Sequence, residues 1–235
     1  MNRNNKKMDY KQMVEFLKTP KGKAVLFFGF YFVFFFVLAV MARINPVTSS
    51  NDYKEDNNFD FSLSQISGNN YHFKYDINID DKSYLYEGKR NGNSELFTLN
   101  SENYYRNGDN FLKNTNNIWL KADNPYIMKE FIDVDSITDI LKVSSLISKT
   151  DYESGMRTYD YNISTTSLVK LIDKQDIDLD DAVNSIFIKA EDEKQVNEIS
   201  FSLDSYCKYK GIGNSCKVLL KYSNFNEVED IKNPS

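Results

Sequence analysis

The most constraining feature of this chain is an apolar segment that runs from residue 24 to residue 42. Its 19 residues, AVLFFGFYFVFFFVLAVMA, include seven phenylalanines and no charged side chain. As a helix, a segment of this length would extend roughly 28 Å, close to the ~30 Å thickness of the hydrocarbon core of a bilayer. Such a helix is apolar on every side and has no face suited to water. The sequence therefore predicts a transmembrane helix at 24–42.

Basic residues flank this segment unequally. Seven lysines and arginines precede it, whereas Arg43 alone follows it before Lys54. Positive charge favours the cytoplasmic side of a membrane, which predicts a single-pass protein of the cell membrane with a cytoplasmic tail at 1–23 and an extracytoplasmic body. A cleaved secretory signal ending at Val40-Met41-Ala42 is the alternative, and the length and bulky aromatics of the segment disfavour it. Both interpretations deliver the body to the same compartment.

The body that follows is acidic and large enough for one core. Beyond residue 43 it carries 21 lysines and arginines against 32 aspartates and glutamates. Nucleic acids and anionic membrane surfaces attract an excess of positive charge, so no nucleic-acid partner is expected. Residues 43–58 are polar and lack periodicity, which is typical of a tether. The remaining residues, 59–235, are predicted to form one extracytoplasmic domain.

Most of the body alternates apolar and polar residues with the period of two that is typical of strands. Asn91-Gly92 and Asn107-Gly108 predict hairpin turns. Helices are expected to begin at Asn124-Pro125, to cover 136–147, and to follow a cap at Thr165 or Thr166. The fold class is therefore α+β, with helices on one face of a curved antiparallel sheet. The expected strands are 71–79, 83–90, 94–99, 104–106, 110–113, 156–164, 184–190, 196–209 and 214–223.

The two cysteines predict a register for the last hairpin. If Gly211-Ile212 is a two-residue type II′ loop, Cys207 faces Cys216 at a site without ladder hydrogen bonds. Their Cα atoms would then lie about 4.5 Å apart, which suits a disulfide. The same register brings an apolar set onto one face, which supports it; the set pairs Phe201 with Tyr222, Leu203 with Leu220 and Ser205 with Val218. A Cys207–Cys216 disulfide is thus predicted, and two free buried thiols are the alternative.

Residues for catalysis or metal binding are sparse. His72 is the one histidine, and it falls on the polar side of the first expected strand. One histidine and two cysteines are too few for a typical zinc site, and they support neither a Ser-His-Asp nor a Cys-His set. The Asp-rich stretches, including DKQDIDLDD at 173–181, lack the glycine and the spacing of a calcium loop. No enzyme, metal or cofactor is therefore predicted.

The order of elements and the local sequence resemble one bacterial envelope family. The meander YLYEGKRNGNSELFTLNSENYYRNGDNFLK, the strand and helix at 156–172, and the ending KVLLKYSNFNEVEDIKNP together resemble the LolA/LppX/LprG-like lipid and lipoprotein carriers over residues 71–234. The resemblance implies a strongly bent sheet, a half-barrel, with helices on its concave side and lipids or acylated molecules bound between the two. This chain departs from the family in its predicted membrane helix, because the carriers are soluble or anchored by an acylated cysteine. The resemblance supplies no catalytic residue.

Three functions follow as hypotheses. The first is a membrane-anchored extracytoplasmic protein that binds a lipid, glycolipid or acylated molecule between sheet and helices. The second is an envelope interaction or sensor ectodomain with a protein partner and no small-molecule ligand, and the third, least supported, is a cell-wall enzyme. Apolar residues of the expected strands are the candidate lining of the ligand site under the first hypothesis, while a plain core role is favoured for most of them individually. They are Tyr84, Tyr86, Phe97, Leu99, Ile186, Ile188, Phe201, Leu203, Leu220 and Tyr222.

Overall fold

The structure of the protein is a computed structural model that describes residues 18–19, 61–177, 179, 182–191 and 195–234. The chain divides into two compact units, Met1–Asp52 and Tyr53–Ser235. Apart from Lys18 and Thr19, the predicted cytoplasmic tail, transmembrane helix and tether lie outside the described residues. Among the residues that are described, no helix is both long and apolar enough to cross a bilayer.

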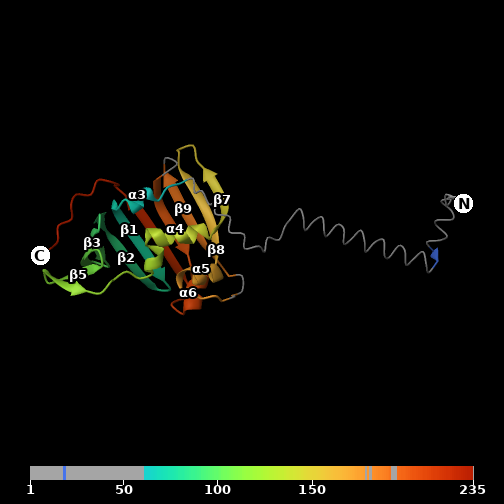
Figure 1. Ribbon diagram of the computed structural model, residues 1–235, viewed down its shortest axis with the longest axis horizontal. Coiled ribbons are helices and arrows are strands. Elements are labelled where there is room, and N and C mark those ends of the chain that lie inside the picture. Colours follow the sequence, from blue (N-terminus) through green and yellow to red (C-terminus); the bar gives the residue numbers. More distant parts are fainter. Residues whose placement is uncertain (1–17, 20–60, 178, 180–181, 192–194, 235) are drawn as a thin grey trace, which may run out of the picture. The chain divides into compact units, whose positions relative to one another are not determined.

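The second unit is built on one large antiparallel sheet (Figure 1). Its order is β6-β5-β4-β3-β2-β1-β11-β10-β9-β8-β7, so β6 and β7 are the two edges and the sheet is not closed. Consecutive hairpins join β1 to β6, and the chain then crosses to the opposite edge and returns strand by strand to pair β11 with β1. The strands are β1 Asn70–Ile79, β2 Lys82–Asn91, β3 Ser94–Leu99, β4 Glu102–Asn107, β5 Asn110–Thr115, β6 Ile118–Ala122, β7 Ser145–Asp151, β8 Arg157–Ser164, β9 Val183–Glu191, β10 Gln195–Ser202 and β11 Cys216–Ser223.

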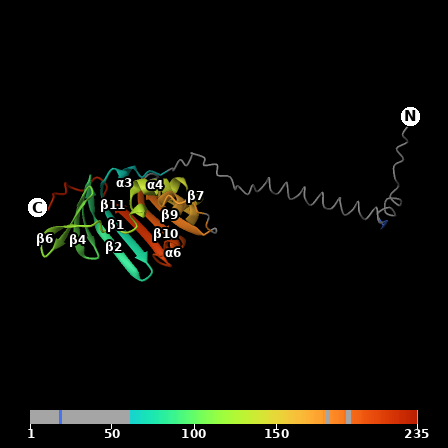
Figure 2. The ribbon, with the colours of Figure 1, turned by 60° about the horizontal axis from the view of Figure 1, so that its bottom comes forward.

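Short helices cover one face of this sheet, which we call the inner face (Figure 2). Asp133 caps α4 by accepting a hydrogen bond from the Ser136 amide, and Ser164 caps α5 in the same way through the Ser167 amide. Apolar side chains of these helices join the core of the sheet. The helices are α3 Ser64–Ser67, the 3-10 helix η1 Lys129–Phe131, α4 Val134–Lys142, α5 Thr165–Ile172 and α6 Asp204–Lys210.

Rows of cross-strand neighbours form the core on the inner face. Strand register aligns one such row across six strands, and each of its members is at most 4% exposed. Because residues opposite each other in a ladder project from the same face, the alternation of each strand places the whole row under the helices. The row consists of Tyr159, Ile188, Ile199, Leu220, Tyr75 and Tyr86.

Gly88 marks a close approach between β2 and β3. It pairs with Phe97, and a Cβ atom at this position would lie 2.4 Å from the Cβ of Phe97 and 2.5 Å from the carbonyl oxygen of Leu96. A side chain of any size is therefore excluded, and the two strands can pack together only around a glycine. The prediction of an α+β fold with an antiparallel sheet and helices on one face is confirmed.

Most predicted strands are present, and the errors concern the segments between them. The sequence did not indicate β6 at all. The helix predicted at Asn124-Pro125 is wrong, because residues 123–128 form neither helix nor strand and only Lys129–Phe131 makes a 3-10 turn. The helix predicted at 136–147 is α4, which ends at Lys142, after which 145–151 form the edge strand β7.

The predicted hairpin around Gly211 is also wrong. Residues Asp204–Lys210 form α6, and Gly211, at φ 67°, is the left-handed residue that ends this helix rather than part of a type II′ loop. Phe201 therefore faces Val218 and not Tyr222. Cys207 lies in α6 and Cys216 at the start of β11, and both are free buried thiols, so the predicted disulfide is not formed.

Candidate ligand-binding pocket

A pocket of about 380 Å³ lies between the inner face and the segment that runs from β6 to α4. We call it the inner pocket. Strands β1 to β4 supply its floor, and the β4–β5 turn, the loop after β6, η1 and the first turn of α4 supply its rim. The residues that line it are Tyr75, Arg90, Glu95, Arg106, Asp109, Asn124, Tyr126, Lys129, Glu130, Ile132, Asp133 and Ser136.

Three charged side chains meet on the floor of the inner pocket. Nη1 of Arg90 and Nη1 of Arg106 lie 3.2 Å and 3.1 Å from the same oxygen, Oε1 of Glu95. The glutamate side chain is 4% exposed, and the two arginine side chains are 23% and 27% exposed. We call these residues the charged triad. Its net charge is +1, and a buried carboxylate of this kind is stable only when it is paired and hydrogen-bonded.

Two tight turns place the charged triad. Arg90 pairs with Glu95, and Glu95 pairs with Arg106, so the three residues form one row across β2, β3 and β4. Each arginine also donates from Nε to the carbonyl oxygen of a turn glycine, at 3.2 Å to Gly92 and 2.7 Å to Gly108. Both glycines have a positive φ, which allows the tight turns. The hairpins therefore fix the guanidinium groups on one carboxylate.

Tyr126, in the loop that follows β6, contacts the charged triad. Its hydroxyl donates to Oε2 of Glu95 at 2.9 Å, while its ring stacks on Tyr86 and Phe97 with centroids 5.1 Å away in each case. Burial and then the adjacent Glu95 raise the pKa of Tyr126 well above its usual value. The tyrosine is therefore neutral and acts as a hydrogen-bond donor. The loop is held in turn by the hydroxyl of Tyr86, which donates to the carbonyl oxygen of Pro125 at 2.9 Å.

Two exposed apolar side chains lie on the inner face of the edge strand β6, on the same side of the sheet as the inner pocket. Tyr104 lies two positions before Arg106 on the same face of β4, and the register continues from Tyr104 through Lys113 to Leu120 on the edge strand. Leu120 and Ile118 are 52% and 62% exposed on the inner face of β6. Positions two apart on a strand are about 6.6 Å apart. We call Leu120 and Ile118 the apolar strip. Tyr104, one such step from Arg106 and only 6% exposed, and Lys113, whose Nζ lies 5.7 Å from the centroid of the Tyr104 ring, stand between the strip and the charged triad.

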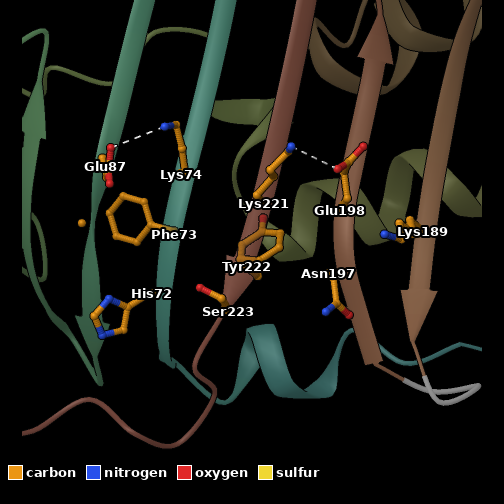
Figure 3. A pocket seen from close by; sticks show the side chains of 11 residues that line it. His72, Phe73, Lys74, Glu87, Lys189, Asn197, Glu198, Lys221, Tyr222 and Ser223 are labelled. Carbon is orange, nitrogen blue, oxygen red and sulfur yellow. Dashed lines mark ion pairs between the residues drawn. The ribbon is translucent and has the colours of Figure 1, made fainter. Parts of the chain in front are cut away.

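A second hollow, of about 490 Å³, lies on the outer face, opposite the helices (Figure 3). Its charges alternate across the strands: Lys74 pairs with Glu87 at 3.6 Å, and Lys221 pairs with Glu198 at 3.5 Å. His72 lies here, on the polar side of β1 as predicted. Exposed ion pairs of this kind contribute little to the free energy of folding and make the outer face hydrophilic. The larger hollow is therefore a weaker candidate than the inner pocket, in which buried charge and aromatic rings converge.

The structure brings the ten predicted lining residues onto the inner face, where they serve mainly as core. Eight of them are at most 3% exposed, and Tyr84 and Leu99 are partly buried against the same cluster. Leu203 precedes α6 rather than lying in a strand. Tyr222 also borders the outer hollow, and none of the ten lines the inner pocket.

Sequence reasoning missed Arg90, Glu95, Arg106 and Tyr126. A signal for three of them was present, because Asn91-Gly92 and Asn107-Gly108 fix the register of two successive hairpins and so align Arg90, Glu95 and Arg106. Nothing local marks Tyr126, which reaches the site from an irregular loop. Within the described residues, no group of three or more histidine, cysteine, aspartate or glutamate side chains is arranged to hold a metal ion.

Cysteine and methionine sulfur atoms form a small cluster beside the end of the loop at 123–128. Sγ of Cys216 lies 3.3 Å from Sδ of Met128, the residue that precedes η1. A hydrogen bond with Cys216, and then burial, raise the pKa of the Cys207 thiol. Both effects keep the thiol protonated and unreactive.

Solved structures that are similar to this chain include one lipoprotein and one LolA superfamily protein. The lipoprotein LppX of Mycobacterium tuberculosis is 14% identical, with a TM-score of 0.45, and the match covers 73% of this chain and 94% of LppX. LprF of Mycobacterium bovis is 10% identical, with a TM-score of 0.48, over 75% of this chain and 94% of LprF. A LolA superfamily protein of Nitrosomonas europaea is 8% identical, with a TM-score of 0.28, over 70% of this chain and 88% of that protein.

No protein-family model matches the sequence, and no curated protein matches it significantly. LppX and a LolA superfamily protein, which bear names of the family that the sequence resembles, are among the similar solved structures.

Proposed function

We propose that this chain is a membrane-anchored extracytoplasmic protein that binds an amphiphile. The polar head of the ligand occupies the inner pocket, and its apolar chain lies on the apolar strip. The observation that carries the proposal is that both surfaces lie on one face of β4 to β6, where Tyr104 and Lys113 separate Arg106 from Leu120. A site with a few convergent polar groups beside apolar walls is typical of small-molecule binding.

The exposed side chains of the apolar strip support a bound chain rather than a second polar group. Leu120 and Ile118 lie on the same face as the core yet remain more than half exposed. The helices pack over the middle and the other half of the sheet, on β1, β8, β9 and β11. An acyl chain laid over these residues would remove their apolar surface from water, and each fully buried aliphatic side chain contributes about 1.5–3 kcal/mol.

Photo-cross-linking of the full chain in proteoliposomes tests the proposal. A diacylglycerol that carries a photoreactive group in its acyl chain is the probe, and labelled peptides are mapped by mass spectrometry. We expect labelling of β6, which Leu120→Asp abolishes. Leu96→Asp is the matched control, because Leu96 is exposed on the outer face of β3 and its change leaves the apolar strip intact. Equal labelling of both variants and the unaltered chain would contradict the proposal.

The anchored topology is part of the same proposal and rests on the apolar segment at 24–42 and the basic residues before it. Protease added to intact cells should digest residues 61–235 and leave the tail at 1–23 protected. The reverse pattern of digestion would refute an extracytoplasmic location.

A second candidate function is the binding of an envelope protein partner at the edge strand β7. All seven residues of β7 are exposed, including Leu146 and Ile147 at 52% and 60%. An open edge with exposed apolar side chains can pair with a strand of another chain. Leu146→Lys should abolish capture of such a partner in cross-linked cells without changing the lipid labelling of β6; an unchanged set of cross-linked proteins would count against this function.

A further inference from the structure

We infer that the inner pocket takes the head group of a zwitterionic amphiphile. The anionic group of this head lies on Arg90 and Arg106, and its ammonium group lies against the carboxylates of Asp109 and Glu130. The inference rests on the proposed function, because it names the class of amphiphile that the same site would hold.

The floor of the pocket carries the charge that selects the anion. Two guanidinium groups share one carboxylate, which leaves one positive charge without a counter-charge in the charged triad. The second carboxylate oxygen is already taken by the Tyr126 hydroxyl. The contacts of Arg106 use Nε and Nη1, so its Nη2 is left to donate to a bound anion. Guanidinium groups bind phosphate and carboxylate through several parallel hydrogen bonds.

The rim of the pocket carries an excess of negative charge. Asp109, Glu130, Asp133 and Lys129 all line the pocket there, for a net charge of −2. Asp133 is occupied, because its Oδ2 accepts hydrogen bonds from the Ser136 amide and hydroxyl, both at 3.0 Å. Among the residues that the structure describes, neither Asp109 nor Glu130 forms an ion pair. The pKa of nearby Lys210 is raised chiefly by its hydrogen bond to Asp173 and in smaller part by the charge of Glu130. A cationic group at the rim would find these two carboxylates available.

A purely anionic or purely cationic head fits this arrangement less well. An anion alone would satisfy the floor but would approach an acidic rim, and a cation alone would meet two arginines at the floor. A head with both charges, such as phosphoethanolamine, complements both layers. The volume of about 380 Å³ is near the lower end of the ~300–1,000 Å³ range of ligand pockets. The pocket is therefore sized for a head group, and the acyl chain extends outside it.

The same zwitterionic chemistry occurs in a lipid head group and in small free molecules. Photo-labelling with a soluble competitor distinguishes these two sources of the ligand. Full-length chain is placed in phosphatidylglycerol proteoliposomes with a trace of photoreactive phosphatidylethanolamine, phosphatidylglycerol or diacylglycerol. The readout is the yield of labelled β6 peptide. We expect phosphatidylethanolamine to label at least about tenfold more than phosphatidylglycerol, the discrimination of one charge-assisted contact. Soluble glycerophosphoethanolamine is then added as a competitor, and we expect it to compete only at much higher concentration.

Variants assign the two charges. Asp109→Asn with Glu130→Gln should lower the labelling by phosphatidylethanolamine to that of phosphatidylglycerol and should not lower the latter. Arg106→Lys keeps a cation beside Glu95, so the fold is preserved, but removes the planar fork, and it should reduce labelling by both phospholipids while diacylglycerol is unaffected. Lys189→Gln, in the outer hollow, is the matched control and should change nothing.

The outcomes are distinguishable. If diacylglycerol and both phospholipids fail to label β6, the proposed function itself is wrong. If all three probes label equally, an amphiphile is bound but the assignment of its head is wrong. Stronger labelling by phosphatidylglycerol than by phosphatidylethanolamine, or unchanged labelling in the Arg106→Lys variant, would also overturn the inference. The remaining outcome is that glycerophosphoethanolamine displaces the lipid probe fully at an equal concentration. That result would show that a free zwitterion is the ligand and would contradict its assignment as an amphiphile.

Discussion

Nη1 of Arg106 lies 3.1 Å from Oε1 of Glu95, on the neighbouring strand, and the carboxylate that it contacts is almost entirely buried. This pair belongs to the charged triad, in which Arg90 contacts the same oxygen. Two partly exposed guanidinium groups are thus held together by one buried negative charge. Removing that charge would leave two arginines in repulsion over the floor of the inner pocket.

Glu95→Gln should therefore destabilise the protein by about 3 kcal/mol, the lower end of the range for breaking a buried ion pair, since the arginines remain partly solvated. Glu87→Gln is the matched control on the adjacent strand. Its partner Lys74 lies 3.6 Å away and both side chains are more than half exposed, so its loss should cost less than about 1 kcal/mol. Denaturant unfolding of the full chain measures both; equal costs for the two variants would show that the triad is not buried as described.

Gly88→Ala should destabilise the sheet by about 1–3 kcal/mol, because the new Cβ would overlap Phe97 and the carbonyl oxygen of Leu96. Gly108→Ala provides the contrast. At Gly108 a Cβ meets nothing within 4 Å, and only the positive φ of 58° opposes it, at about 1 kcal/mol. Melting temperatures of the two variants should rank Gly88→Ala below Gly108→Ala, and the opposite order would disprove the close approach of β2 and β3.

The strands of the first half of the sheet follow from local pattern, and the candidate site does not. Residues 94–99 were predicted to form a strand, and β3 has these bounds, because alternation and a hairpin turn determine both ends. The inner pocket, by contrast, needs the loop at 123–128 to fold back over β3. Tyr126 reaches Glu95 across 31 positions of sequence, and no local periodicity encodes such a contact.

The last hairpin shows how an apolar pattern can be satisfied by two structures. The sequence predicted that Phe201 faces Tyr222, whereas the structure pairs it with Val218. The observed register differs from the predicted one by an even number of residues, so the same side chains stay on the inner face. The apolar pattern of one face therefore fits both registers and does not distinguish them. Helix α6 replaces the expected strand end because a helix also buries Tyr206 and Cys207 and ends at a glycine that adopts a left-handed conformation.

Asp80 should make the stability of the sheet depend on acid. Its Oδ1 accepts hydrogen bonds from the amides of Asn214 and Ser215 at 2.8 Å and 3.0 Å, and these bonds lower its pKa below the usual 3.8. A lowered pKa stabilises the fold fully above the unfolded value and progressively less as the pH falls below 3.8 through the folded value. Asp80→Asn should be less stable than the unaltered protein at pH 7, and the difference should shrink below pH 4. A difference that stays constant from pH 7 to about pH 2 would contradict this linkage.

The two cysteines should behave as buried thiols. Both are fully buried and free, so a membrane-impermeant maleimide should label neither in the native protein and both after unfolding without reductant. Met128→Ala is informative, because Met128 lies against Cys216 at the inner end of the loop; its removal should make the Cys216 thiol the first to react. If no thiol is labelled after unfolding until a reductant is added, the cysteines are joined and the arrangement of α6 and β11 described here is wrong.

The C-terminal segment should be released by a single change in β1. Val228 is buried against the end of the sheet. Its backbone N–H donates to Oδ1 of Asn70 at 2.9 Å, and its carbonyl oxygen accepts a hydrogen bond from the side-chain Nδ2 of Asn70 at 3.1 Å. Asn91 contributes one further hydrogen bond to the same carbonyl. Asn70→Ala removes two of the three hydrogen bonds, each with a net contribution of about 0.5–1.5 kcal/mol. Carboxypeptidase digestion should then proceed past residue 228 in this variant and stop before it in the unaltered protein. Asn78→Ala is the control, since Asn78 lies on the same strand and its side chain donates to Asp76 within that strand; equal trimming of Asn70→Ala and this control would show that Asn70 does not hold the segment.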